Sequence, residues 1–235
     1  MMKKSDSQVK EYGSQFWLRR VVNCARCLID RELASATETT KEPIEWVSPL
    51  EPDFKEYHDQ EFIDKLGISL KKVPLAEFWP KGGPNWDALA RTSSRKVFLV
   101  EAKAHISELN STPSGASAKP MERIAARLKE TQAFLNATPH VDWTRTFYQY
   151  TNRIAHLYLL RELNGIDAYL VNVYFLNDTR MKGPAKIEEW KGALTLLKTH
   201  LGITRTKLSP FMKDIFIDVR GIRNGSSAAP NRALN

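Results

Sequence analysis

The sequence predicts an α/β fold in which helices cover a central mixed sheet. Along the 235-residue chain, segments with helical periodicity alternate with short runs that are apolar at nearly every position. The clearest of these runs, at 96–105 and 168–178, have the length and composition of strands in the interior of a sheet. Strands interleaved with helices are typical of α/β and mixed-sheet domains.

The N-terminal half predicts two helices followed by a hairpin. Apolar positions about 3.6 residues apart predict an amphipathic helix over 14–34. The segment 42–66 contains eight acidic and two basic side chains. A stripe of apolar side chains at helical spacing predicts a second helix over 51–67, which ends at Gly67. Three segments complete this half: an extended stretch at 68–80, a short strand after the turn at 81–85, and a polar turn at 91–95 that leads into the strand 96–105.

The C-terminal half predicts three helices and two strands. They follow a loop at 107–119 that is rich in Ser, Pro and Gly. The last residues have no apolar pattern, so we expect one domain over 1–222 and a flexible tail over 223–235. The expected elements are helices at 121–136, 145–163 and 188–202 and strands at 168–178 and 214–219.

The charge is basic and unevenly distributed. Lys and Arg number 35 against 27 Asp and Glu, a formal net charge of +8. Between Thr179 and Lys213 there are eight basic side chains and two Glu. A local basic excess suits contact with a phosphate backbone, although scattered solvated lysines give the same count. Nucleic acid is therefore the expected partner.

Several protein classes are excluded. The sequence contains no run of about 18 apolar residues, so no transmembrane helix is expected. The N-terminal lysines are not followed by the apolar stretch of a secretory signal. The only cysteines, Cys24 and Cys27, are too few for a disulfide framework and lack the further ligands of a structural zinc site. We therefore expect a cytoplasmic protein that does not contact a membrane.

Three charged side chains converge in the predicted hairpin. If the polar turn joins two antiparallel strands, the hairpin is centred near Ser93 and Asp87 opposes Leu99. Glu101 then lies one diagonal step from Asp87. Because side chains alternate along a strand, Glu101 and Lys103 share one face, and Asp87 can join it. The hairpin therefore predicts two carboxylates and an ammonium group together at the end of an apolar strand.

This arrangement predicts a divalent cation site. Buried charges are costly unless they are paired or bind a metal. Mg²⁺ uses one or two carboxylates, keeps several waters and accepts a substrate phosphate. Lys103 beside the cation would orient or help to deprotonate the attacking water, or stabilise charge that develops on the phosphate. The pattern therefore favours metal-assisted hydrolysis of a phosphodiester.

The same residues resemble the motif of the PD-(D/E)XK nuclease superfamily, which has the restriction-endonuclease-like fold. The match consists of Asp87, which follows Pro84, and of Glu101-Ala102-Lys103 at the end of the apolar strand. It covers a short part of the chain, and two residues separate Pro84 from Asp87 where the family's motif has the proline adjacent.

The resemblance implies both a fold and a set of roles. The fold would be an αβββαβ core with a central mixed sheet, flanking helices and extra helices at the N-terminus. Asp87 and Glu101 would hold the metal together with the backbone carbonyl of Ala102, and Lys103 would be the catalytic lysine.

A polar stripe crosses the helix predicted at 145–163. Gln149, Asn152, Arg153 and His156 stand at i, i+3, i+4 and i+7. Members of the superfamily often bring a Gln or a basic residue to the site from the helix after the E-x-K strand, so the resemblance implies Gln149 as a further catalytic residue. A solvent-exposed face that carries amides gives the same pattern.

The superfamily often adds a glutamate from its first helix to the metal ligands. Glu56 and Glu61 in the acidic segment are candidates, and so is Glu11 near the N-terminus. Their spacing does not choose among them.

Together these patterns predict a Mg²⁺-dependent nuclease, with Mn²⁺ as a substitute metal and DNA favoured over RNA as the nucleic-acid partner. Analogy with double-strand cutters adds a homodimer as an open alternative. The first rival is a nucleic-acid-binding protein on the same fold that does not cleave, or cleaves only in a larger assembly. The second rival is an unrelated basic nucleic-acid-binding module in which the E-x-K is accidental. The third is a structural or interaction protein with no nucleic-acid partner.

Overall fold

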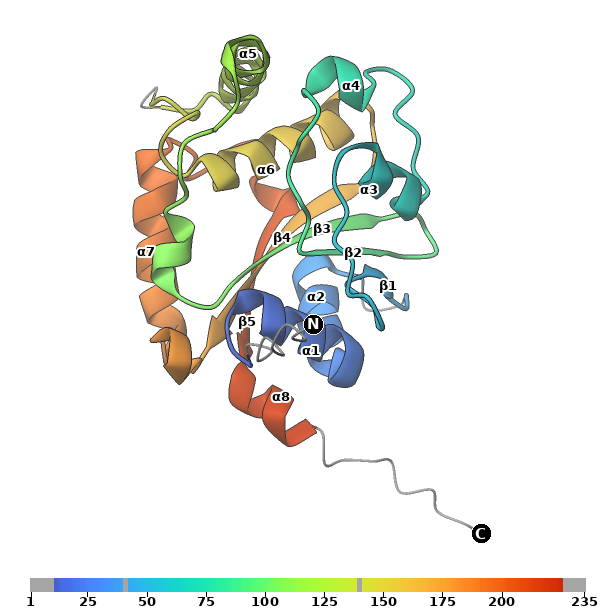
Figure 1. Ribbon diagram of the computed structural model, residues 1–235, viewed down its shortest axis with the longest axis vertical. Helices are drawn as coiled ribbons and strands as arrows, with labels where there is room; N and C mark the ends of the chain where they lie inside the picture. Colours follow the sequence, from blue (N-terminus) through green and yellow to red (C-terminus); the bar gives the residue numbers. More distant parts are fainter. Residues whose placement is uncertain (1–10, 40–41, 139–140, 226–235) are drawn as a thin grey trace, which may run out of the picture.

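A five-stranded mixed sheet separates two layers of helices in the computed structural model, which describes residues 11–39, 42–138 and 141–225 (Figure 1). The first three strands of the sheet pair antiparallel with one another. The third, fourth and fifth pair parallel with one another. The α/β class with a mixed sheet flanked by helices is thus confirmed. In the order of the sheet, the strands are β1 (Glu45–Ser48), β2 (Ala88–Arg91), β3 (Val97–Lys103), β4 (Ala168–Leu176) and β5 (Met212–Asp218).

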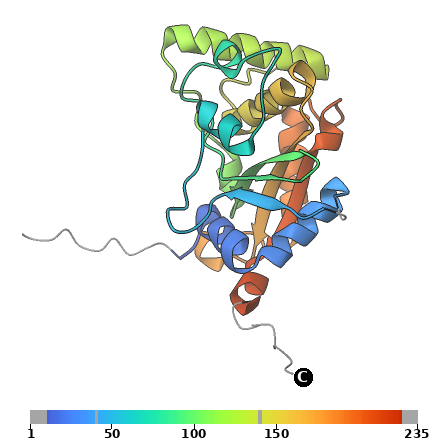
Figure 2. The same ribbon diagram turned by 90° about the vertical axis from the view of Figure 1, so that its right-hand side faces the viewer.

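The helices divide between the two faces of the sheet (Figure 2). One face is covered by α1 (Ser14–Cys24), α2 (Arg26–Thr37) and α8 (Val219–Gly225). The other is covered by α3 (Asp59–Leu66), α4 (Leu75–Phe78), α5 (Ala118–Leu135), α6 (Tyr148–Tyr158) and α7 (Ile187–His200). Shorter helical turns are η1 (Ile106–Leu109), a π-helical turn η2 (Leu159–Leu163) that continues α6, η3 (Thr179–Met181) and η4 (Ser209–Phe211).

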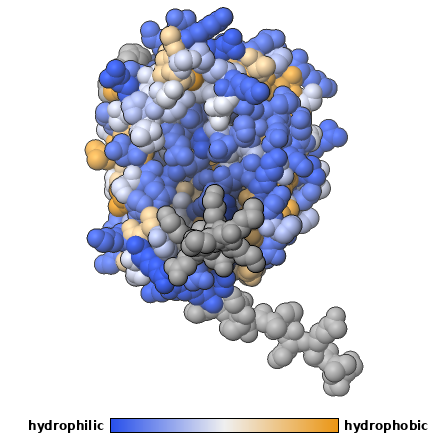
Figure 3. All heavy atoms as spheres, viewed as in Figure 1, coloured by the Kyte–Doolittle hydropathy of each residue, from blue (hydrophilic) through white to orange (hydrophobic). Residues whose placement is uncertain are grey.

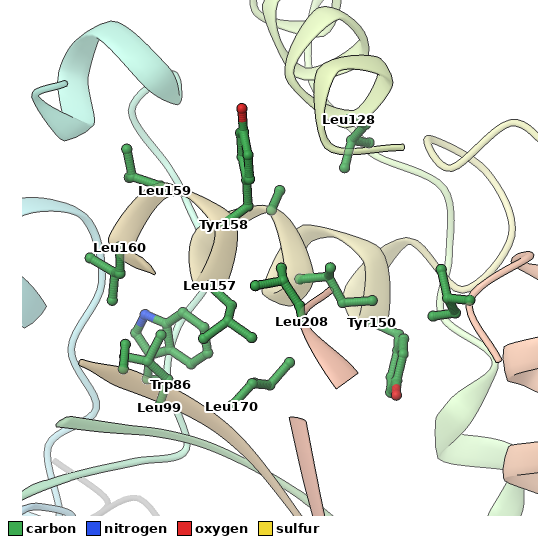
Figure 4. Close-up of a cluster of buried hydrophobic side chains, with 14 of the residues drawn as sticks. Trp86, Leu99, Leu128, Tyr150, Leu157, Tyr158, Leu159, Leu160, Leu170 and Leu208 are labelled. Atoms are coloured by element: carbon green, nitrogen blue, oxygen red, sulfur yellow. The ribbon is translucent and has the colours of Figure 1, made fainter. Parts of the chain in front are cut away.

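Strand β3 contributes side chains to both cores. Leu99 packs beneath α6 beside Leu157 and Leu170 (Figure 4), whereas Val100 and its alternate neighbours face α1 and α2. Every residue of β3 up to Ala102 is buried. The strand lies between β2 and β4 with helices on both sides, which explains why its apolar run does not alternate with polar residues.

Tertiary packing breaks the first helix predicted near the N-terminus into two and shortens the second. The first breaks at Ala25 (φ −137°, ψ 39°), so that α1 packs on β3 and α2 on β5. The second begins only at Asp59. The chain before it contains Pro52, which cannot donate to a helix, and Tyr57, which bridges to Trp86 instead. The segment 42–66 also contains β1, and the stretch expected to be extended contains α4; neither was predicted.

The hairpin has a different register from the predicted one. Ala88 pairs with Val100 and Leu89 with Leu99, so the hairpin is centred on Ser94. A shift of two positions leaves every side chain on its expected face. The pairing, continued one step beyond the end of β2, places Asp87 opposite Glu101.

At the C-terminus, Arg223–Gly225 belong to α8, so the predicted tail begins too early. The remainder of that prediction, 226–235, lies outside the described residues. Within the described ranges no helix has both the length and the apolar character needed to cross a membrane.

Candidate active site

Glu101 forms the centre of a buried cluster of charges. Its carboxylate, only 6% exposed, accepts a hydrogen bond from Lys103 Nζ on Oε1 and one from Arg153 Nε on Oε2 at 2.8 Å. Arg153 also donates to the carbonyl of Asn85 at 2.7 Å, and its guanidinium lies 4.9 Å from the centre of the Trp86 ring. Lys103 therefore contacts Glu101 on the same face of β3, as predicted.

Asp87 directly precedes β2, where the ladder with β3 begins. Its Oδ2 accepts the backbone N–H of Ala102 at 2.8 Å, which fixes the half-buried carboxylate against β3. This contact uses the amide of Ala102 and leaves the predicted role of its carbonyl untested.

Gln149 reaches the same cluster from the first turn of α6. Its Oε1 accepts a hydrogen bond from Lys103 Nζ at 2.9 Å. The backbone N–H of Gln149 donates to Ser111 Oγ at 2.8 Å, so the loop after η1 is joined to the start of α6. Lys103 is thus held between Glu101 and Gln149, which lie 48 positions apart in the sequence.

The rest of the polar stripe on α6 is buried, so the interpretation as a solvent-exposed face is wrong. Asn152 Oδ1 accepts a hydrogen bond from Arg153 at 2.9 Å. His156, one turn further on, is surrounded by aromatic rings: Phe62, Phe78, Trp79 and Trp86. Burial there lowers the pKa of His156 to about 4, so the ring is neutral at pH 7.

The two carboxyl groups of the cluster have opposite pKa shifts. Burial, and then the negative charge of Glu101, raise the pKa of Asp87 to about 7. Burial would also raise the pKa of Glu101, but the charges of Arg153 and Lys103 outweigh it and the pKa is lowered. Glu101 is therefore ionised at neutral pH, whereas Asp87 exchanges its proton there.

A hydrophilic groove of about 640 Å³ opens over the cluster. Asp87, Lys103, Gln149 and Arg153 line its floor, and the loop after η1 forms one wall. In the orientation of Figure 1, hydrophilic residues cover the middle of the molecular face (Figure 3). Two further acids, Glu56 and Glu108, line the groove as well.

The three candidate glutamates for an additional ligand are in different places. Glu56 lines the groove, in the loop before α3; its Oε1 accepts a hydrogen bond from Gln15 and lies 3.8 Å from Arg19. Glu61 is exposed on α3 and pairs with Lys55 at 3.1 Å, and Glu11 is exposed near the N-terminus. Of these three candidates, Glu56 alone lines the same groove as Asp87.

The donor set fits a divalent cation in part. The described residues contain no group of three or more His, Cys, Asp or Glu side chains arranged to hold a metal. Asp87 and Glu101 supply the two carboxylates that Mg²⁺ can use when waters and phosphate complete its shell. Burial, and after it the negative charge of Glu101, raises the pKa of Asp87, and a bound cation would offset that charge. A cation would have to share Glu101 with Lys103 and Arg153.

The basic stretch from Thr179 to Lys213 does not line the groove. Within it, Lys198 is paired with Asp214 at 2.5 Å, and Lys207 lies over the ring of Phe134. A phosphate-binding surface on this stretch would therefore lie outside the groove.

A polar row continues from Glu101 across the sheet, which the sequence analysis missed. Asn172 of β4 pairs with Glu101 in the strand register and donates to Asp214 of β5 at 3.0 Å. An Asn in the middle of an apolar strand was the available signal. The pairing of Arg153 with Glu101 was also missed, although Arg153 lies one turn after Gln149 on the same helix.

No family model, curated protein or solved structure matches the chain. Its function is therefore inferred from the site alone.

Proposed function

We propose that this protein is a divalent-metal-dependent nuclease that hydrolyses phosphodiester bonds in DNA. One observation carries the proposal: Asp87, Lys103 and Gln149, from three separate segments, line one hydrophilic groove, and Lys103 is bonded there to the buried carboxylate of Glu101. Charged side chains are seldom brought together in a protein interior without a functional reason, because removing them from water is costly.

The order of the elements supports a restriction-endonuclease-like core. Helices precede three antiparallel strands, then a helical crossover leads to a parallel strand. Apart from α3 and α4, which are inserted between β1 and β2, that is the αβββαβ order, with the E-x-K residues on the third strand. Strand β5 and α7 extend the core on the β4 side.

In this proposal Asp87, Glu101 and the carbonyl of Ala102 hold Mg²⁺ or Mn²⁺. The bound cation supplies Lewis acidity to the phosphate and to a water. Lys103 donates hydrogen bonds to the phosphate oxygens, on which negative charge develops. Gln149 accepts a hydrogen bond from Lys103 and keeps the Lys103 ammonium group directed into the groove. Arg153 holds Glu101 ionised and fixed in orientation.

Cleavage assays on single-stranded DNA, duplex DNA and RNA, with Mg²⁺, Mn²⁺ or EDTA, test this assignment. Lys103→Ala should lower the cleavage rate by about 10²–10³-fold while keeping metal binding, because the ammonium acts on the transition state. Glu101→Gln should lose both. Lys129→Ala, an exposed lysine on α5, is the matched control and should cleave normally. Cleavage by Lys103→Ala at the wild-type rate would refute the mechanism.

The full occupation of Glu101 favours a second candidate, a nucleic-acid-binding protein that does not cleave. Both carboxylate oxygens already accept hydrogen bonds from cationic groups, so the cluster is neutralised without a metal. Calorimetric titration with Mg²⁺ and Mn²⁺ separates the two candidates. Metal binding that depends on Asp87 and Glu101 supports the nuclease, and its absence together with intact DNA binding supports the second candidate.

A further inference from the structure

A second hollow lies beside the groove, at the start of α1. It has a volume of about 650 Å³, within the range of sites that bind small molecules and cofactors. Its apolar lining includes three aromatic side chains, Tyr12, Phe16 and Phe54. We call this hollow the α1 pocket.

The α1 pocket adjoins the groove. Glu108 of η1 lines both hollows. Glu56, on the groove wall, is bonded to Gln15 and lies 3.8 Å from Arg19, and both of these residues line the α1 pocket. The groove and the α1 pocket therefore share a wall, and a polymer bound along the groove passes the pocket.

The walls of the pocket combine an aromatic face with hydrogen-bonding groups. The guanidinium of Arg19 lies 5.5 Å from the centre of the Phe54 ring, and Arg19 Nε is buried with no hydrogen-bond partner among the described residues. Asn23 and Gln15 add amides. Aromatic rings and guanidinium planes stack on bases, and amides bond to base edges.

The charge of the pocket favours a base over a phosphate. Among the described residues that line the pocket, two arginines, Arg19 and Arg20, equal in number two acids, Glu51 and Glu108. A site without net charge gains little from a phosphate, whereas a base supplies a flat apolar face and polar edges. None of the six tryptophans can take this role, because all are buried.

We propose that the α1 pocket binds an unpaired base of the substrate strand, next to the phosphate that the groove receives. The substrate class is then single-stranded nucleic acid, or duplex with a single-stranded end, because a paired base cannot enter a pocket. The link to cleavage rests on the proposed nuclease function; the binding of the base does not.

Fluorescence anisotropy with labelled DNA tests the pocket without cleavage. Wild-type protein in EDTA and Lys103→Ala in Mg²⁺ are titrated with a single-stranded oligonucleotide, a blunt duplex and a duplex with a single-stranded end. Both proteins should bind the first and third more tightly than the blunt duplex. Phe54→Ala and Phe54→Leu should each weaken single-strand binding by about tenfold, because one stacked base is lost. Blunt-duplex binding should not change.

Phe54→Leu keeps an apolar side chain and separates loss of stacking from loss of fold. Phe134→Ala removes a half-buried ring on α5 and is the control that should bind normally. Photocrosslinking with 5-iodouracil in the single strand, followed by mass spectrometry, should label Tyr12, Phe16 or Phe54.

The outcomes separate the two proposals. Base binding that depends on Phe54, without cleavage under any metal condition, retains the pocket and refutes the nuclease. Cleavage with equal affinity for single strands and blunt duplex, or crosslinks outside the pocket, refutes the pocket and retains the nuclease.

Discussion

Replacing Asp87 by Asn should stabilise the protein in neutral and alkaline solution without metal. In the folded protein, burial and the charge of Glu101 raise the pKa of Asp87 to about 7 from an ordinary value of 3.8. Asparagine keeps a side-chain oxygen that can accept the Ala102 N–H, a 2.8 Å contact in the wild type. It has no negative charge to place beside Glu101.

The sign and size of the effect follow from proton linkage. The folded protein holds the Asp87 proton to a higher pH than the unfolded chain does. The resulting stabilisation is complete below pH 3.8 and is lost as the pH rises to about 7. One pKa unit is about 1.4 kcal/mol, so the loss is at most about 4 kcal/mol. The Asn variant has no ionisable group at this position, so its unfolding free energy does not undergo this loss.

Urea unfolding of both proteins at pH 4, 6 and 8 in EDTA measures this difference. The variant should gain less than about 1 kcal/mol over the wild type at pH 4 and several times that at pH 8. Asp64→Asn, an exposed carboxyl on α3, is the control and should show no pH-dependent gain. Millimolar Mg²⁺ should then stabilise the wild type at pH 8 and not the Asn variant. A difference that stays constant with pH would refute the assigned electrostatics.

Three further substitutions test the roles of residues on α6. Arg153→Met should lower the free energy of unfolding by about 3–5 kcal/mol, since Glu101 stays buried with one partner fewer; adding Glu101→Gln should restore part of it, and an unfolding free energy equal to wild type would contradict the role of this pair. His156 stays neutral because burial lowers its pKa to about 4, so it should contribute about 3 kcal/mol above pH 6.5 that is lost as the pH falls to 4; urea unfolding of His156→Gln should show a weaker acid dependence, and an unchanged one would count against it. Gln149→Leu should slow cleavage about tenfold with unchanged calorimetric Mg²⁺ affinity, because Lys103 loses one of its two acceptors; weaker Mg²⁺ binding would place Gln149 at the metal instead.

Local sequence patterns predict much of the fold. They fail for elements whose conformation depends on pairing with a strand that is distant in the sequence. Strand β3 and helix α5 end within a few residues of the predicted boundaries, because a continuous apolar run marks the strand and a helical period marks the helix. Strand β1 has only four residues within an acidic segment. It becomes a strand by pairing with β2, where the carboxylate of Glu45 accepts a hydrogen bond from Arg91 at 2.8 Å. No window of sequence around β1 contains that partner.

The site divides in the same way. Strand alternation is sufficient to predict that Glu101 and Lys103 share a face. The register depends on how the turn closes: Thr92 N–H bonds to the carbonyl of Lys96, which centres the hairpin one residue later than expected. The contact of Arg153 with Glu101 requires the packing of α6 on the sheet, which periodicity indicates but does not orient.

Ala102, the residue between Glu101 and Lys103, is 1% exposed and contributes to the opposite core, together with the apolar face of α1. A larger side chain at this position would push β3 away from α1 and would tilt both flanking charged groups, since one short backbone carries all three. Ala102 therefore couples the packing of the core beneath α1 to the positions of the charged side chains on the groove side of β3. Substitutions at Leu18 or Val22 on α1 would change the aim of Lys103 through this link. Variants with altered activity can thus be sought on a helix face that contributes no side chain to the groove.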